Sequence, residues 1–167
     1  ANAPNSGNDT SRAIYDVVQS FIALLSPDGI LLDANHSSLA FIGIDLEEVV
    51  GRPFCETPWW RDCQASQEAL KDAIQRGASG EGSRFEARHT GKDGKVIEVD
   101  FSLTPLFDDA GSVAFLVPEA RDITAIKKTA NALFETRARL GLAYEAADIG
   151  TWDWDLAKGQ LHWSDRQ

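Results

Sequence analysis

The sequence is poor in several residue types, and each shortage narrows the function. Its 167 residues include no methionine and two cysteines, and 16 lysines and arginines face 26 aspartates and glutamates, which gives a formal charge of −10. Sequence-independent binding of nucleic acid needs a basic surface, so we expect neither a nucleic-acid partner nor contact with an anionic membrane. Because methionine is missing even from position 1, we expect the sequence to be a piece of a longer protein.

Long apolar runs are missing too. The longest, FIALL and VAFLV, have the length of a strand, whereas a membrane-spanning helix needs about 18 apolar residues. Residues 1–11 have neither the basic start nor the apolar stretch of a secretion signal, so we expect a cytoplasmic protein. In that compartment Cys55 and Cys63 would be reduced. No lysine or histidine adjoins either thiol, so we expect both to be structural and redox-silent.

Hydrophobic residues make up 43% of the chain, enough for a core, and their spacing predicts most of the secondary structure. Residues 1–8 are polar and predict no structure, and a short helix is predicted from Thr10. Four apolar residues recur at helical spacing, and we expect this stripe to cover the outer face of a sheet or to pair with its copy in a second chain. The stripe consists of Ile14, Val17, Val18 and Phe21.

The next segments predict a sheet with helices inserted in it. The turn SPDG between two apolar runs predicts a hairpin over 21–35, and short helical pieces follow as far as Gly51. A longer helix is predicted over 65–76. Three strands come after it, and the last begins apolar on both faces, as a central strand would, although Pro118 predicts a bulge or distortion there. These strands span 83–90, 95–106 and 112–124.

After Thr124 the composition changes. An apolar position recurs every seven residues, which favours a short coiled-coil helix over 125–148 rather than a lone surface helix. The repeat consists of Ile126, Leu133, Leu140 and Ala147. The chain ends in GTWDWDLAKGQLHWSDRQ, which predicts a two-stranded hairpin that is too small to be a domain.

This order of elements, together with four segments, resembles a PAS domain, the α/β sensor module of bacterial signalling proteins, over residues 21–124. The segments are SPDGILLDAN, EEVVGRPF, GKDGKVIEVDFSLTPLFDDAGSV and the closing RDIT. The resemblance implies an α+β fold, in which a five-stranded antiparallel sheet carries short helices on one face. Helices within 1–20 and 125–148 would flank it, and residues 149–167 resemble the opening hairpin of a second PAS domain.

The stretch GRPFCETPWWRDC, residues 51–63, can be compared with the motif of light-sensing PAS domains that bind a flavin. Flavin-binding PAS domains of this kind carry Gly-x-Asn-Cys, but Phe54 occupies the cysteine position here and Pro53 the asparagine position. Cys55 comes one residue late, which turns its sulfur by about 100° on a helix. We therefore expect no covalent flavin adduct. Three further positions that hold the flavin ring fall on His89, Val99 and Ala120.

Other cofactors receive little support from the sequence. Haem-binding PAS domains commonly supply a histidine from the long helix, but residues 65–76 contain none, and we expect His36 and His89 to be solvated. The two cysteines do not have the spacing of a zinc site, so no metal is expected. A non-covalent FAD stacked on Trp59 or Trp60 stays an alternative to simple core packing of these rings.

Two hypotheses remain for the space between the helices and the sheet. In the first, a small molecule or cofactor occupies a pocket and the domain is a sensor. In the second, the pocket is collapsed and the domain is an interaction and dimerisation spacer. The nearly apolar wall favours the second hypothesis, or an apolar ligand. The wall candidates are Phe54, Trp59 or Trp60, Leu70, Ile74, Val99 and Phe101.

The resemblance implies a sensory module and dimerisation element of a multidomain bacterial protein, a sensor histidine kinase rather than a diguanylate cyclase or phosphodiesterase. No nucleophile, phosphate-loop or acid–base motif appears, so we expect no catalysis in this chain. Expected partners are a second copy and an effector domain of the same protein. We expect Asp122, Ile123 and Thr124 to pass the signal into the following helix, with Thr124 as its N-cap and Asp122 near its first N–H groups.

Overall fold

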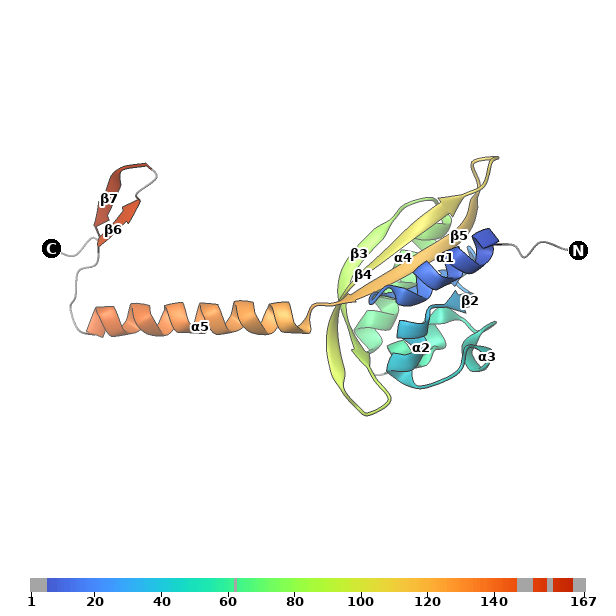
Figure 1. Cartoon of the computed structure of the whole chain (residues 1–167), viewed down its shortest axis with the longest axis horizontal. Helices are drawn as coiled ribbons and strands as arrows, with labels where there is room; N and C mark the ends of the chain where they lie inside the picture. Colours follow the sequence, from blue (N-terminus) through green and yellow to red (C-terminus); the bar gives the residue numbers. More distant parts are fainter. Residues whose placement is uncertain (1–5, 62, 147–151, 156–157, 164–167) are drawn as a thin grey trace, which may run out of the picture. The chain divides into compact units, whose positions relative to one another are not determined.

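The computed structural model describes residues 6–61, 63–146, 152–155 and 158–163. The chain divides into two compact units, residues 1–124 and 125–167, and each is described by itself. The first unit is built on a five-stranded sheet with the order β2-β1-β5-β4-β3, in which all neighbours are antiparallel (Figure 1). This confirms the predicted fold and places β5 at the centre. The strands are β1 (Phe21–Leu25), β2 (Leu31–Ala34), β3 (Ser83–Thr90), β4 (Val96–Phe107) and β5 (Val113–Asp122).

Between β2 and β3 the chain forms several helices that cover one face of the sheet, as predicted (Figure 1). They are α2 (His36–Ile42), α3 (Leu46–Val49), the short 3-10 helices η1 (Phe54–Glu56) and η2 (Pro58–Trp60), and α4 (Gln64–Ala78). The longest, α4, packs against β3, β4 and β5. Gly77 allows this close approach, because a Cβ at that position would lie 2.8 Å from Cδ2 of Leu103.

Alternation along β4 separates the two faces of the sheet. The residues that face the helices are each at most 1% exposed, and they form the centre of the core. They are Ile97, Val99, Phe101 and Leu103. On the opposite face Glu98 and Asp100 form ion pairs with Arg88 and Arg84 of β3. One face of the sheet is therefore dry and apolar, and the other carries paired charges.

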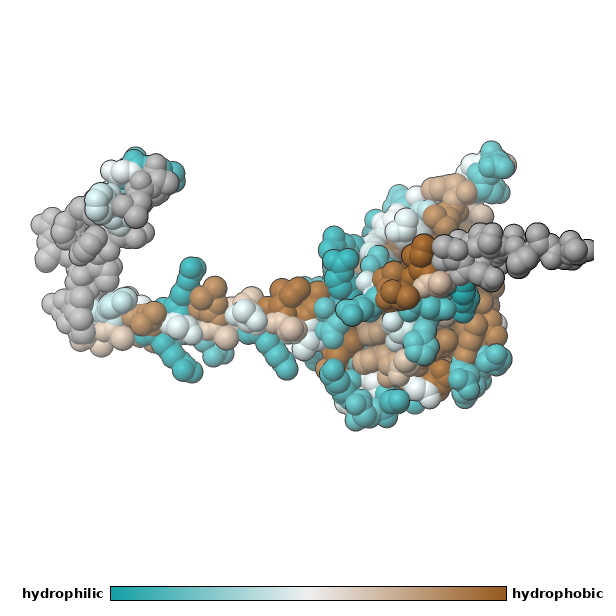
Figure 2. Space-filling model, viewed as in Figure 1, coloured by the Kyte–Doolittle hydropathy of each residue, from teal (hydrophilic) through white to brown (hydrophobic). Residues whose placement is uncertain are grey.

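The N-terminal helix α1 (Ser6–Val17) departs from the prediction. Val18 lies beyond its end and Phe21 belongs to β1, so the four apolar residues do not form one helical face and that prediction is wrong. Ile14 and Val17 are 63% and 79% exposed, and apolar atoms reach the surface in this part of the unit (Figure 2). The physical reason is a bend between Val18 and Phe21, which turns the chain from the helix into the sheet.

Pro118 causes no bulge in the pairing with β4, but the predicted distortion is present on the β1 side. There β5 has paired residues at Leu116, Glu119 and Ala120, and none at Val117 and Pro118. The pairing of β4 with β5 keeps one register through Leu103 and Pro118, and its register shift falls between Leu106 and Phe107. Proline lacks an N–H, but in an antiparallel strand the N–H and C=O of a residue point toward one neighbour only. The other neighbour therefore keeps its ladder, and the buried Pro118 faces the helices.

The second unit consists of a long helix and a hairpin. The helix α5 (Thr124–Ala146) follows β5 directly, and β6 (Trp152–Asp155) pairs antiparallel with β7 (Gln160–Trp163). Three members of the predicted heptad repeat, Ile126, Leu133 and Leu140, are 67%, 54% and 49% exposed, and Ala147 lies outside the described residues.

Among the residues that the structure describes, no helix is long and apolar enough to cross a membrane. The hairpin alone does not show a second PAS domain.

Candidate functional site

A small cavity lies between the helices and the inner face of the sheet. Its volume is about 20 Å³, which is room for about one water molecule. Three of the predicted wall residues, Phe54, Trp59 and Phe101, do line it. His89 and Ala120 also line it, at two of the three positions that hold the ring in flavin-binding PAS domains. The sequence did not predict the other wall residues, which are Phe21, Ile22, Ala23, Ser38 and Pro118.

Four predicted wall residues lie elsewhere. Trp60, Leu70 and Val99 are fully buried in the core around the cavity, each 0% exposed, but they do not line it. Ile74 packs against Gly29 of the turn between β1 and β2, where an added Cβ would lie 2.9 Å from its Cγ2. Phe21, predicted on the outer stripe, instead lines the cavity. The sequence pattern identifies all the residues that point into the core, whereas only some of these residues line the cavity.

The two adjacent tryptophans belong to an aromatic cluster. Trp60 makes T-shaped contacts with His89 and Phe101, with ring centroids 4.8 Å and 5.0 Å away, and Phe54 lies 5.8 Å from it. Trp59 is 3% exposed and lies 5.9 Å from Phe54. The pair therefore packs in the core, and Trp59 also forms part of the cavity wall.

His89 is not solvated, and that prediction is wrong. Its side chain is 2% exposed, and burial lowers its pKa to about 4, so the ring is neutral near pH 7. Neither ring nitrogen has a hydrogen-bond partner among the described residues, and the same holds for Nε1 of Trp60. The alternation of residues along β3 could have predicted this burial, because His89 shares a face with the inward residues Phe85 and Ala87. The exposed His36 matches the prediction.

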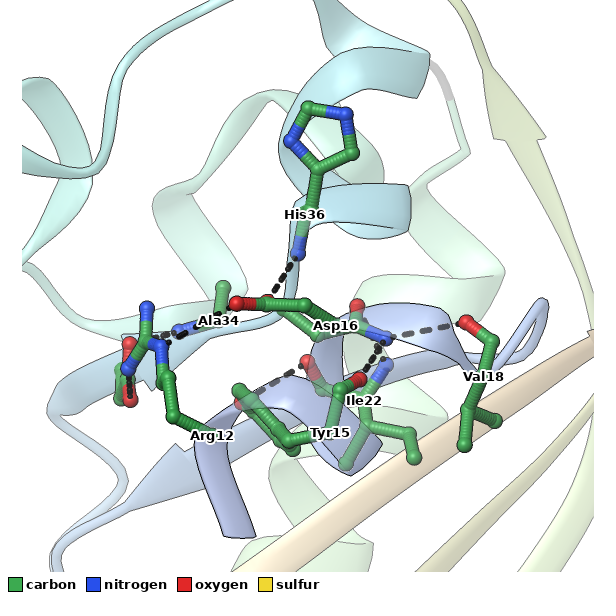
Figure 3. A network of polar contacts seen from close by, with 9 residues as sticks. Arg12, Tyr15, Asp16, Val18, Ile22, Ala34 and His36 are labelled. Atoms are coloured by element: carbon green, nitrogen blue, oxygen red, sulfur yellow. Dashed lines mark hydrogen bonds and ion pairs between the residues drawn. The ribbon is translucent and has the colours of Figure 1, made fainter. Parts of the chain in front are cut away.

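Another group of buried polar residues adjoins the cavity and is fully bonded. Asn35, 0% exposed, is the N-cap of α2, and its Oδ1 accepts the N–H of Ser38 at 3.1 Å. The Ser38 hydroxyl donates to the same oxygen at 2.6 Å, and the Ser38 carbonyl accepts Nε1–H of Trp59 at 3.1 Å. This network also reaches α1, through Tyr15 (Figure 3). An asparagine directly before a helix was the available sequence signal for this cap.

The junction between β5 and α5 is tied to β4. The N–H of Ile123 donates to the carbonyl of Glu98 at 2.9 Å, and the N–H of Glu98 donates to the Thr124 hydroxyl at 2.9 Å. Asp122 Oδ1 accepts the N–H of Thr124, the first residue of α5, at 2.8 Å. Asp122 therefore lies where it was predicted. The Thr124 hydroxyl does not cap the helix as predicted, because it binds the neighbouring strand instead.

Cys63 lies next to hydrogen-bond donors that were not expected from the sequence. It is the N-cap residue of α4, and although its sulfur makes no full capping hydrogen bond, the Ser66 hydroxyl and N–H and the Ala65 N–H favour the thiolate. These groups lower the pKa of Cys63 below its ordinary value. The prediction considered charged neighbours in the sequence, including Arg52 and Arg61, and missed the donors at the helix N-terminus. Cys55 and Cys63 are both free and partly buried, and their redox silence stays a prediction.

The geometry also bears on cofactors. Pockets for ligands of drug size enclose about 300–1,000 Å³, whereas this cavity has about 20 Å³, and the expectations about flavin and haem stay predictions. Cys55 does not line the cavity. In the part of the chain that the structure describes, no three histidine, cysteine or acidic side chains gather where they could hold a metal ion.

The comparisons with known proteins agree with this architecture. The model of the PAS fold family matches residues 15–128. The chain is 36% identical over 124 residues to hybrid signal transduction histidine kinase D of Dictyostelium discoideum, which covers 73% of this chain and 8% of the kinase. It is 36% identical over 130 residues to the sensor histidine kinase TmoS of Ectopseudomonas mendocina, which covers 77% of this chain and 13% of that protein.

Two further relatives extend the comparison. A probable diguanylate cyclase of Escherichia coli, DgcE, is 26% identical over 147 residues, or 87% of this chain and 13% of the cyclase. The solved PAS domain of Bordetella pertussis BvgS superposes with a TM-score of 0.58 at 18% identity, over 81% of this chain and 99% of that domain. The chain thus spans about a tenth of its curated relatives. The fold, the family match and the kinase relatives together establish that this chain belongs to the PAS domain family and is homologous to PAS regions of sensor histidine kinases.

Proposed function

We propose that the chain is a sensory and regulatory PAS module, and a dimerisation element, of a multidomain signalling protein. A sensor histidine kinase is favoured over a diguanylate cyclase or phosphodiesterase, because the two kinases are 36% identical to this chain and the cyclase 26%. Catalysis then belongs to an effector domain elsewhere in the same protein. The two free cysteines support a reducing compartment, the cytoplasm.

The observation that carries this proposal is the junction at Asp122, Ile123 and Thr124. The central strand β5 runs into α5 without an intervening loop, and between Arg121 and Leu140 the sequence has neither glycine nor proline. The hydrogen bonds between Ile123, Thr124 and β4 hold the start of the helix to the sheet. A displacement of β5 therefore moves the start of α5 as a rigid body, which is how a strand can pass a conformational change to an effector.

The helix itself supports dimerisation. Ile126, Leu133 and Leu140 repeat at seven-residue spacing and leave about half or more of their surface exposed, at 67%, 54% and 49%. Pairing with the same stripe of a second copy would bury them in a coiled coil. In such a dimer, movement of the junction becomes a rotation or a change of register, which both effector domains receive.

The cavity favours a spacer over a cofactor sensor. With a volume of about 20 Å³, it admits a guest larger than water only if the helices move away from the sheet. This makes non-covalent FAD the weaker alternative. A small apolar molecule that widens the cavity next to Phe54 and Phe101 stays compatible with the sensory role.

The register of α5 provides the test. In the full-length protein, an insertion of seven residues after Arg137 restores the helical face and should keep regulation of the effector. An insertion of two or five residues turns the downstream face by about 160° or 140°, close to half a revolution, and should lock the output on or off. The measurement is effector activity with and without the stimulus, or, where the stimulus is not identified, the basal activity of each variant.

The same insertions after Asp109, in the turn between β4 and β5, serve as the control, because they leave the register of α5 unchanged. They should have little effect on output at any length. Equal behaviour of all insertions in α5 would show that the helix is a tether, and the proposed transmission would then be wrong.

A further inference from the structure

The N-terminal helix α1 is held to the first unit mainly by polar groups. Arg12 forms an ion pair with Asp33 of β2, and Asp16 accepts the N–H of His36 at 2.9 Å (Figure 3). The hydroxyl of Tyr15 donates to the carbonyl of Ile22 at 3.1 Å. The apolar side chains Ile14 and Val17, in contrast, are mostly exposed. An element that buries little apolar surface has a low free energy of local release, so these polar bonds decide whether α1 stays attached.

Asn35 is the centre of the attachment. Its Nδ2 donates to the carbonyls of Tyr15 at 3.1 Å and Ser20 at 2.9 Å, with that of Val18 at 3.4 Å, all of which belong to α1 or the segment after it. Its Oδ1 accepts the N–H of Ile22 and both the N–H and the hydroxyl of Ser38. The amide orientation is fixed, since carbonyls surround one end and donors the other. One end of this side chain thus holds α1, and the other end holds α2 and β1.

The same residues connect α1 to the cavity. Ser38 donates its hydroxyl to Asn35, accepts the indole N–H of Trp59 at its carbonyl, and lines the cavity together with Trp59. Asn35, Ser38 and Trp59 are 0%, 3% and 3% exposed, so water does not compete for these bonds. A continuous chain of hydrogen bonds therefore runs from the cavity wall through Ser38 and Asn35 to the carbonyls that end α1.

We propose that Asn35 is the positioning residue of a releasable strap. A change in the position of Trp59 at the cavity wall shifts Ser38 and the Asn35 amide, and thereby changes how firmly residues 12–20 are attached. The strap couples the interior to the part of the chain before Phe21, as α5 couples it to the part of the chain after Asp122. This inference adds a second route to the proposed function and does not depend on transmission through α5.

The first test separates the two ends of the Asn35 side chain. Asn35→Asp keeps an oxygen that accepts from Ile22 and Ser38, and so keeps the cap of α2, but it replaces the donor with a carboxylate oxygen facing three carbonyls. Amide hydrogen exchange should accelerate at least about tenfold in residues 12–20. Exchange in β4, at residues 97–103, should accelerate clearly less, because it reports only the loss of global stability. Unchanged exchange in α1, or an equal acceleration in β4, would refute a separable strap.

The second test addresses coupling to the cavity with a matched pair of variants. Trp59→Phe removes the indole N–H that binds the Ser38 carbonyl, whereas Trp60→Phe removes the same volume and an indole N–H without a partner among the described residues. Trp59→Phe should accelerate exchange in residues 12–20 by about three- to tenfold, and Trp60→Phe should not. If both variants accelerate it equally, the effect is general loosening of the core. If neither does, Trp59 is not coupled to α1, and either result overturns the proposal.

Discussion

Two regions of buried polar groups in this domain differ in their hydrogen-bond partners. Around Asn35, the side chains of Ser38 and Trp59 each have a hydrogen-bond partner, at 2.6 Å and 3.1 Å. Around Trp60 and His89, the three ring nitrogens have none among the described residues. Both regions are buried, so the difference lies in the hydrogen-bond partners and not in the burial.

The first region is held in one geometry by its hydrogen bonds, whereas the second would become more stable by rearranging. The bonded region joins β1, α2, η2 and α1, so its geometry is determined by many mutually supporting bonds. An unpartnered buried group costs about 1–3 kcal/mol, so the region around His89 lowers the stability of the packed state. A guest or rearrangement that offers it a partner would recover that free energy. The hydrogen bonds of the first region therefore stabilise the fold. A stimulus that provides hydrogen-bond partners in the second region recovers the most free energy.

The largest expected effect comes from emptying the bonded region. Asn35→Ala removes a buried amide that bonds to α1, β1 and α2, and it leaves several backbone groups without partners. The free energy of unfolding should fall by about 3–5 kcal/mol, because each unsatisfied buried group adds to the loss. Urea unfolding followed by tryptophan fluorescence measures this change.

Asn35→Asp is the matched variant, because it retains the acceptor for Ser38 and Ile22. At neutral pH its buried carboxylate faces carbonyl oxygens, so it should cost at least as much as Asn35→Ala. At low pH, where the carboxyl is protonated and again donates a hydrogen bond, it should cost clearly less than Asn35→Ala. Equal losses at low pH would show that the fixed region does not depend on the acceptor end of Asn35, and the contrast between the two regions would weaken.

A smaller effect is expected around His89, where a substitution should stabilise the protein rather than destabilise it. Burial lowers the pKa of His89 to about 4, from an ordinary value of 6.5. Between these pH values the unfolded chain binds a proton at His89 that the folded chain does not. The free energy of unfolding therefore falls as the pH drops from 6.5 to 4, by up to about 3 kcal/mol in all, and this contribution is constant above 6.5.

His89→Phe removes both the titration and the unpartnered nitrogens, and a phenyl ring suits the aromatic neighbours Trp60 and Phe21. The variant should be more stable than the wild type at pH 7, and its advantage should grow by about 2 kcal/mol at pH 5. Thermal melts at the two pH values measure this. The matched control is His36→Gln, which replaces an exposed histidine. An advantage that does not depend on pH would mean that His89 is solvated in solution.

Sequence patterns predicted the fold well because they depend on burial of whole faces. The alternation of β4 and the apolar start of β5 identified the sheet, its inner face and its central strand. The same reasoning failed for α1, because the spacing of Ile14, Val17, Val18 and Phe21 fits a helix that the chain leaves at Val17. Polar bonds to Asn35 override the apolar pattern there, and hydropathy does not detect them.

The candidate site was less predictable for a related reason. A list of inward residues does not say which of them adjoin a void of about 20 Å³, so Phe54, Trp59 and Phe101 were identified together with the fully packed Trp60 and Leu70. Whether a buried nitrogen finds a partner depends on neighbours distant in sequence. Trp59 finds the carbonyl of a residue 21 positions away, and the adjacent Trp60 finds none among the described residues.

The adjacent tryptophans give the smallest and most direct test of the comparison. Trp59→Phe and Trp60→Phe remove the same atoms from a buried indole, so their packing losses are similar in kind. Only Trp59→Phe also removes a hydrogen bond, whereas Trp60→Phe removes a buried N–H that has no partner within the described part of the chain. Trp59→Phe should therefore be less stable than Trp60→Phe by about 1–2 kcal/mol at neutral pH. Urea unfolding must be monitored by circular dichroism here, since both changes alter the fluorescence. An equal or larger loss for Trp60→Phe would mean that its N–H is bonded in solution, and the two regions would then no longer differ.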